Sequence, residues 1–206
     1  MNEFLQALVS LLAITNPIVA APIFLGIVAG MPEDARRRAA GHAGLAVFAI
    51  LAGSALGGRY TLELFGISLD AFRTAGGLVI ILVGLEMLRG SPSGIQQDEA
   101  SPGDARDRIF VPFAMPLVAG PGAITTAITL SVTYPSRIHL PVIALVAAAA
   151  CALVLWAILR LALARQQLVT PRVERIFTRF MGLILVAIGF QIGMLGIRDF
   201  FGLGGA

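Results

Sequence analysis

NPIVAAP at residues 16–22 and MPLVAGP at residues 115–121 are the two stretches that decide the fold. Each stretch places two prolines five residues apart inside an apolar run, and the residues between the prolines match in kind. A proline lacks the backbone donor of an ordinary residue and clashes with the preceding helical turn. Two such prolines in one run therefore predict an interrupted helix, and the sequence contains this pattern twice.

The runs around these stretches have the length and composition of membrane spans. Hydrophobic residues make up 57% of the 206-residue chain and charged residues 13%, whereas charged residues make up about 25% of a soluble domain. A bilayer core about 30 Å thick takes about 20 helical residues to cross, and backbone groups inside it must bond within the helix. We expect an all-α membrane protein with six transmembrane helices, at residues 4–30, 40–58, 70–89, 110–133, 139–163 and 176–198.

The basic residues predict the orientation of these spans. All 15 are arginines, and most of them fall in the loops after the first, third and fifth predicted spans. Short loops rich in Lys and Arg face the cytoplasm, so both termini are expected on the periplasmic or extracellular side. The segment 91–109 is rich in Ser, Pro, Gly and Asp, and we expect it to be a cytoplasmic linker.

The two halves of the chain are predicted to be repeats within one transmembrane domain, residues 1–206. Gly77 and Gly84 in the third predicted span lie seven residues apart, as do Gly182 and Gly189 in the sixth. Residues 1–90 and 110–200 each hold three spans, and because three is odd the second repeat is predicted to be inverted relative to the first. The alternative is that the halves share only the composition of membrane helices.

The predicted broken helices in spans one and four form the candidate binding site. Unwound backbone at membrane depth occurs where it lines a cavity. The start of a half-helix offers N–H groups that suit a carboxylate, and the end of the preceding half offers carbonyls that suit an ammonium group. Two facing breaks predict a site for a small, net-neutral zwitterion, unless the prolines only kink the helices for packing. The candidate binding residues are Thr15, Asn16, Pro17, Pro22, Pro116, Gly120, Pro121, Gly122, Thr125 and Thr126.

Two further polar residues occupy equivalent places in the third and sixth predicted spans. An ionisable residue within a span is a functional candidate, so Glu86 is a candidate for coupling transport to an ion. It lies three residues before Arg89, and an ion pair between the two at the cytoplasmic end of the span is the interpretation that we favour. Gln191, the repeat partner of Glu86, is expected to pack or hydrogen-bond within the helix bundle.

The sequence offers few residues for catalysis, metal binding or disulfide formation. The single cysteine, Cys151, excludes an internal disulfide, and the two histidines have no metal-ligand spacing. We therefore expect no catalytic residue, no metal and no cofactor. The arginines do not gather in one patch, so nucleic acid is not an expected partner, whereas the run at 36–38 suits anionic lipid headgroups. Assembly into a homo-oligomer through a glycine pair such as Gly53 and Gly57 stays open.

On these residues the sequence resembles the MarC family of bacterial inner-membrane proteins. The resemblance rests on NPIVAAP, on PLVAGPGAI at 116–124, on Gly76-Gly77 and on RFMG at 179–182, and it covers nearly the whole chain. It implies a six-span fold in the inner membrane, related to the LysE-type amino-acid exporters, and transport of small neutral amino acids such as glycine and alanine. It also implies that the candidate residues of both motifs lie at the binding breaks. In this alignment Asn16 is matched by Met115, so the site is expected to be asymmetric.

Secondary transport of small neutral amino acids, as export or exchange, is the function that the sequence favours. The chain has no phosphate-binding loop of the type G-x4-G-K-S/T, so the expected coupling partner is a proton or a sodium ion. A passive channel or facilitator for small polar solutes is the alternative, because half-helix dipoles also line pores. A membrane enzyme is the third class, and the predicted spans lack a nucleophile–base pair that it would need.

Overall fold

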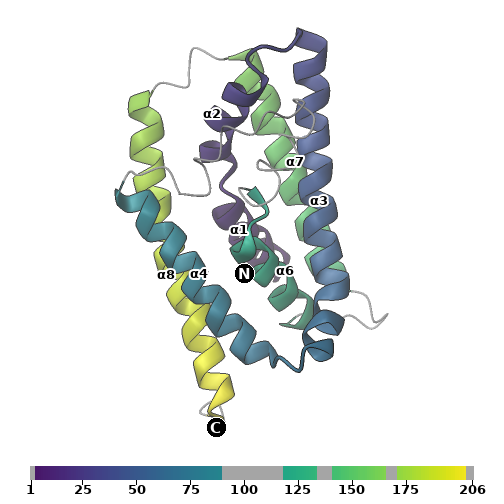
Figure 1. The fold of residues 1–206 in the computed structure, drawn as a ribbon, viewed down its shortest axis with the longest axis vertical. Helices are drawn as coiled ribbons and strands as arrows, with labels where there is room; N and C mark the ends of the chain where they lie inside the picture. The colour runs from purple at the N-terminus through teal and green to yellow at the C-terminus, as the bar shows by residue number, and fades with distance from the viewer. Residues whose placement is uncertain (1–2, 90–117, 134–140, 166–170, 203–206) are drawn as a thin grey trace.

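The computed structural model describes residues 3–89, 118–133, 141–165 and 171–202, and the regular structure in these ranges is helical throughout (Figure 1). In chain order the helices are α1 (Glu3–Thr15), α2 (Pro17–Val28), α3 (Glu33–Leu64), α4 (Leu69–Arg89), α6 (Pro121–Thr133), α7 (Val142–Ala164) and α8 (Pro171–Phe200). The predicted all-α class is confirmed for this part of the chain. The predicted linker at 91–109 lies outside the described residues.

Four of these helices are long and apolar enough to cross a membrane, namely α3, α4, α7 and the Thr178–Phe200 part of α8. Helices α1 and α2 together form a fifth candidate span, which is bent by 41°. Helix α6 has 13 residues and is too short to cross a bilayer alone. The first half of the predicted span 110–133 lies outside the described residues, so the sixth span stays a prediction.

The break between α1 and α2 is a single residue, Asn16. Its backbone has φ 40° and ψ 66°, a left-handed conformation that Asn adopts more readily than most residues. Its amide donates to the carbonyl of Leu12 at 3.0 Å, and Pro17 then begins α2 at a position where a helix has no use for the missing N–H. The predicted break in span one is confirmed. A second interruption at Pro22 is not: α2 continues through Pro22 to Val28, because a proline inside a helix can bend it without ending it.

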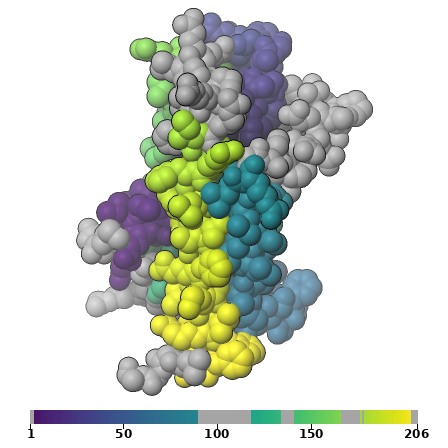
Figure 2. Space-filling model, turned by 90° about the vertical axis from the view of Figure 1, so that its left-hand side faces the viewer, coloured from purple at the N-terminus to yellow at the C-terminus, as the bar shows by residue number. Residues whose placement is uncertain are grey.

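Helices α4 and α8 lie side by side and run in opposite directions (Figures 1 and 2). Their backbones meet at glycines: a Cβ added to Gly77 would lie 2.6 Å from the carbonyl oxygen of Gly189, and one added to Gly84 would lie 2.7 Å from that of Gly182. Small residues at such positions allow membrane helices to approach closely. The glycines that the sequence matched between spans three and six are therefore the contact surface between α4 and α8.

The other helices form a second group around α3 and α7. Helix α7 contacts α1, α2 and α3, and helix α6 contacts α1, α3, α4 and α7. The buried core of this group is built largely of alanines, with the fully buried Phe24, Leu51 and Leu155 among its larger side chains. Helix α6 therefore connects the α3–α7 group with the α4–α8 pair.

Candidate functional site

A cavity of about 110 Å³ lies between the α1–α2 break and the start of α6. The break contributes Thr15 and Asn16, and the start of α6 contributes Gly120, Pro121 and Gly122. These five residues were predicted to line one site from two motifs that lie about half a chain apart, and the structure brings them together. The remaining wall comes mainly from α2, α4 and α8 and is apolar, with Val19, Ile23, Val79, Ile80, Val83, Met87 and Leu185 among its side chains.

The end of α1 leaves backbone acceptors without their usual donors. The carbonyl of Ala13 would normally accept from the amide four residues later, but Pro17 has none. The carbonyl of Thr15 would normally accept from Val19, whose amide instead donates to the carbonyl of Asn16 at 3.1 Å. The C-terminal end of a helix carries a partial negative charge. This side of the cavity therefore suits a cationic group such as an ammonium.

The start of α6 presents the opposite polarity. Pro121 is its first residue and has no N–H, and the amides of Gly122 and Ala123 lie in the first turn, where a helix supplies no acceptor of its own. The first amide bonded back within this turn is that of Ile124, which donates to the carbonyl of Gly120 at 3.0 Å. Free N–H groups together with the positive end of the helix dipole suit an anionic group such as a carboxylate.

Asn16 adds a polar side chain to this cavity. The residue is only 7% exposed, and its Nδ2 has no hydrogen-bond partner within the described residues. A buried donor without a partner costs about 1–3 kcal/mol, so a ligand oxygen in the cavity would remove this cost. The residue also has a positive φ angle, which few side chains tolerate. This backbone conformation places Asn16 at the break between α1 and α2.

The three candidate threonines use their hydroxyl groups locally. Thr15 Oγ1 donates to the carbonyl of Leu11 at 2.8 Å and lies 3.3 Å from Cys151 Sγ. Thr125 and Thr126 donate to the carbonyls four residues earlier, each at 2.9 Å. The last two are buried but do not line the cavity; Thr125 lies against Gly76 of α4. This back-bonding uses the hydroxyls of Thr125 and Thr126 within α6, away from the cavity.

The four candidate prolines do not occupy the positions that matching the two motifs predicts. Pro17 and Pro121 are each the first residue of a helix, and Pro121 lines the cavity, whereas Pro17 does not. Pro22 is inside α2 and away from the cavity, and Pro116 lies outside the described residues. The structural counterpart of Asn16 is therefore Gly120, not Met115.

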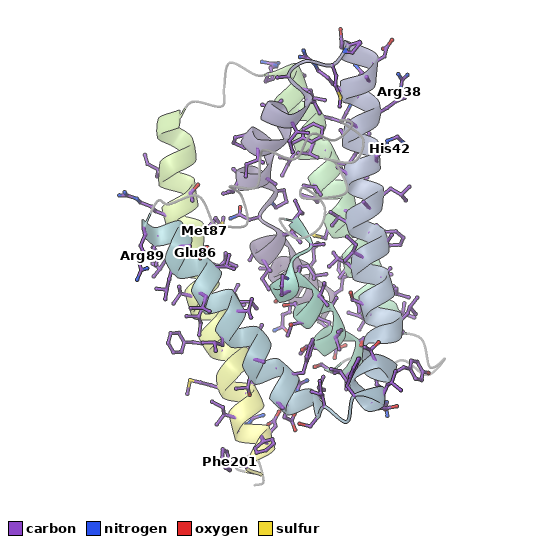
Figure 3. All side chains as sticks on the ribbon, viewed as in Figure 1. Arg38, His42, Glu86, Met87, Arg89 and Phe201 are labelled. Atoms are coloured by element: carbon purple, nitrogen blue, oxygen red, sulfur yellow. The ribbon has the colours of Figure 1, made fainter. Side chains whose placement is uncertain are left out.

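Glu86 and Gln191 also lie outside the cavity. Glu86 is half-buried near the end of α4, one residue before Met87, which does line it (Figure 3). The expected ion pair between Glu86 and Arg89 is absent, although both residues are described. Gln191 is exposed on α8 rather than bonded within the bundle, because the glycines of α8 turn the opposite face of that helix toward α4.

The apolar wall from α4 and α8 is the part of the site that sequence reasoning missed. Ile80 and Leu185 are almost fully buried, and they come from helices without a broken segment. Their sequence surroundings are ordinary apolar runs, so no local signal could have assigned them to the site. Within the described ranges, no group of three or more His, Cys, Asp or Glu side chains could hold a metal ion.

Comparison with known proteins places the chain in a family. The pattern of the MarC family of integral membrane proteins matches residues 1–201. The chain belongs to the MarC family. This agrees with a multi-pass helical structure, and it confirms the resemblance seen in the two proline motifs.

Other members of the MarC family resemble the chain along its whole length. It is 34% identical to a UPF0056 membrane protein of Pyrococcus abyssi, over 98% of each chain. It is 37% identical to a UPF0056 membrane protein of Methanocaldococcus jannaschii, over 96% of this chain and 97% of the relative. It is 33% identical to the UPF0056 inner membrane protein MarC of Salmonella typhimurium, over 93% and 92%. No solved structure matches the chain.

Proposed function

We propose that this MarC family chain is a secondary transporter, an exporter or exchanger, of small neutral amino acids such as glycine and alanine across the inner membrane. The observation that carries the proposal is the cavity between the α1–α2 break and the start of α6. One side of it has the carbonyls at the end of α1 that lack their usual donors, and the unpartnered Asn16 Nδ2 belongs to the same break. The other side has the free amides at the start of α6. An α-amino acid has the two complementary groups, an ammonium and a carboxylate, on the same α carbon.

The charge and size of the cavity support a small neutral substrate. None of the described residues that line it is ionisable, so they offer no partner for a charged side chain, whose burial without one is costly. The walls from Val19, Ile80 and Val83 are aliphatic. They suit a substrate whose side chain is a hydrogen atom or a short apolar group.

An inverted repeat with alternating access is part of the proposal. The repeat that matches Gly77 with Gly182 also matches Gly84 with Gly189. The contacts run crosswise, Gly77 to Gly189 and Gly84 to Gly182, as a two-fold axis between antiparallel helices requires. The contact of α2 with α7 likewise has a counterpart in that of α6 with α3. Transporters of this architecture bind substrate at the repeat interface.

The packing of α6 near Gly58 and Gly76 favours a carrier over an open channel. Gly76 lies against Thr125, and Gly58 lies against Ile128, so α6 is closely packed with α4 and α3 beyond the cavity. A passive pore needs a continuous path, whereas a carrier is closed on at least one side at any time. Coupling to a proton or a sodium ion completes the proposed mechanism, with Glu86 as the candidate carboxylate.

Ligand-induced stabilisation of the purified protein tests the binding site. We expect glycine and alanine to raise the unfolding midpoint, because a ligand that binds only the folded state stabilises it, and we expect glutamate and lysine not to. Asn16→Gly keeps the left-handed backbone accessible and removes only the amide. It should weaken binding about 10- to 100-fold, as expected for a hydrogen bond to a charged group worth about 1.5–3 kcal/mol.

A matched control is Ser54→Ala in α3, which removes a half-buried hydroxyl bonded to Ile50 and distant in sequence from both breaks. It should leave the stabilisation unchanged. Counterflow of radiolabelled alanine in liposomes then separates a carrier from a channel. The proposal fails if none of the small neutral amino acids stabilises a monodisperse protein, or if Asn16→Gly binds them as well as the unchanged chain does.

A further inference from the structure

Arg73 joins three helices at the end of the bundle where α4 begins and α6 and α8 end. Its guanidinium Nη1 lies 3.3 Å from Asp199 Oδ2 of α8 and 3.7 Å from Asp70 Oδ1 of α4. Its Nη2 donates to Thr133 Oγ1, at the last residue of α6, at 2.9 Å. The Arg73 side chain is only 15% exposed. We call these four residues the Arg73 cluster.

The Arg73 cluster differs from the other charged pairs in the described part of the chain. The pairs Arg37–Glu33 and Arg59–Glu63 lie within α3, and Arg198 pairs with the adjacent Asp199. Only the Arg73–Asp199 pair joins two helices within the described ranges. Exposed pairs within one helix contribute little to stability, whereas a half-buried pair between helices fixes their relative position.

The cavity extends away from the Arg73 cluster. On α4 it is lined from Val79 to Met87, and Met87 lies about 21 Å from Arg73 along the helix at about 1.5 Å per residue. On the first span it is lined mainly beyond the break, by Val19, Ala20 and Ile23 of α2. Between the cavity and the Arg73 cluster, α6 packs against Gly76 and Gly58. The described helices are therefore closely packed between the cavity and the Arg73 cluster.

We propose that the Arg73 cluster is the latch that holds the transporter closed at this end, which the arginine distribution predicts to face outward. Arg73 ties the last residue of α6 to α4 and α8, and α6 is the helix that separates the cavity from this end. Opening the cavity here requires α6 to move away from α4, which breaks the Thr133 hydrogen bond first. The inference rests on the proposed transport function, because a latch has a purpose only if the cavity opens alternately to the two sides.

A cysteine reporter in the cavity tests the latch without any substrate. Cys151, the only cysteine, is replaced by alanine, and Ala20→Cys places a thiol on the cavity wall. Vesicles of both orientations are treated with a membrane-impermeant thiol reagent. With the latch intact, we expect fast modification from the Glu86 side and slow modification from the Arg73 side.

Arg73→Gln should raise the modification rate from the Arg73 side at least about tenfold, which corresponds to a shift of about 1.4 kcal/mol in the opening equilibrium. Thr133→Val, which leaves the ion pairs in place, should raise it by a smaller factor. Arg59→Gln is the matched control, because Arg59 pairs only with Glu63 of its own helix near the same end of the bundle, and it should leave the rate unchanged. Gel filtration selects variants that remain monodisperse.

Two results would overturn the latch. One is an unchanged rate from the Arg73 side in both Arg73→Gln and Thr133→Val. The other is equal modification from the two sides before any change is made to the cluster. Failure to find a stabilising amino acid would count against the proposed substrate, but it would leave this accessibility result intact.

Discussion

Gly77 of α4 lies so close to Gly189 of α8 that a Cβ at position 77 would come within 2.6 Å of the Gly189 carbonyl oxygen. Neither backbone can yield easily, because each is part of a long helix. We therefore expect Gly77→Ala to destabilise the protein by about 1–3 kcal/mol, the range for inserting a methyl group into a packed interior. The unfolding midpoint in detergent, measured at a fixed scan rate, checks this.

Gly53→Ala in α3 is the control for that substitution. A Cβ at Gly53 would meet nothing within 4 Å, and alanine favours helix over glycine by about 1 kcal/mol. The midpoint should stay the same or rise. An equal loss of stability in both variants would mean that the glycine contacts between α4 and α8 are not the cause.

Asn16→Ala should destabilise the protein more than Asn16→Gly does. Alanine in the left-handed region costs about 1–2 kcal/mol, and glycine does not. Both changes remove the unpartnered Nδ2, so the difference between the two variants isolates the backbone cost at the break. The measurement is the difference between the unfolding midpoints of the two variants without ligand. Equal midpoints would mean that residue 16 does not hold this conformation in the membrane protein.

Val83→Ala should shift substrate preference toward larger side chains. Val83 is half-buried and lines the cavity, so truncation enlarges the space without touching either helix break. A methylene group in an apolar pocket is worth about 1–3 kcal/mol, or 10- to 200-fold in discrimination. The ratio of valine to alanine binding, measured by thermal shift or competition, should rise at least about tenfold. Leu82→Ala, on the exposed side of the same helix, should leave that ratio unchanged.

Glu86→Gln should leave amino-acid binding unchanged, because Glu86 does not line the cavity and forms no ion pair with Arg89. The effect of this substitution on transport distinguishes a role of Glu86 in ion coupling from a role in substrate binding. Counterflow of alanine should persist, since exchange needs no net ion movement, while loss of pH-driven flux would assign the coupling proton to Glu86. Loss of counterflow itself would contradict the position of Glu86 outside the binding site.

The sequence predicted the break at Asn16-Pro17 and its meeting with Gly120-Pro121 because proline and glycine act locally on the backbone. It did not predict that α2 would run through Pro22, since a helix packed on both sides can tolerate one missing hydrogen bond. Thr125 and Thr126 do not line the cavity, because a hydroxyl near the start of a helix can also bond back into that helix. Ile80 and Leu185 reach the cavity only through the packing of α4 and α8, which a single apolar run cannot reveal.

Asn16 is the whole connection between α1 and α2, and Pro17 beside it has a φ angle fixed by its ring. Reorientation of α2 relative to α1 is therefore confined to a few backbone torsions, unlike the wide sweep that a long unwound segment would permit. The joint is therefore a hinge with few degrees of freedom, and Asn16 within it lines the cavity. A small turn about it would move Val19 and Ile23 at the cavity wall while Thr15 stays anchored to Cys151 of α7.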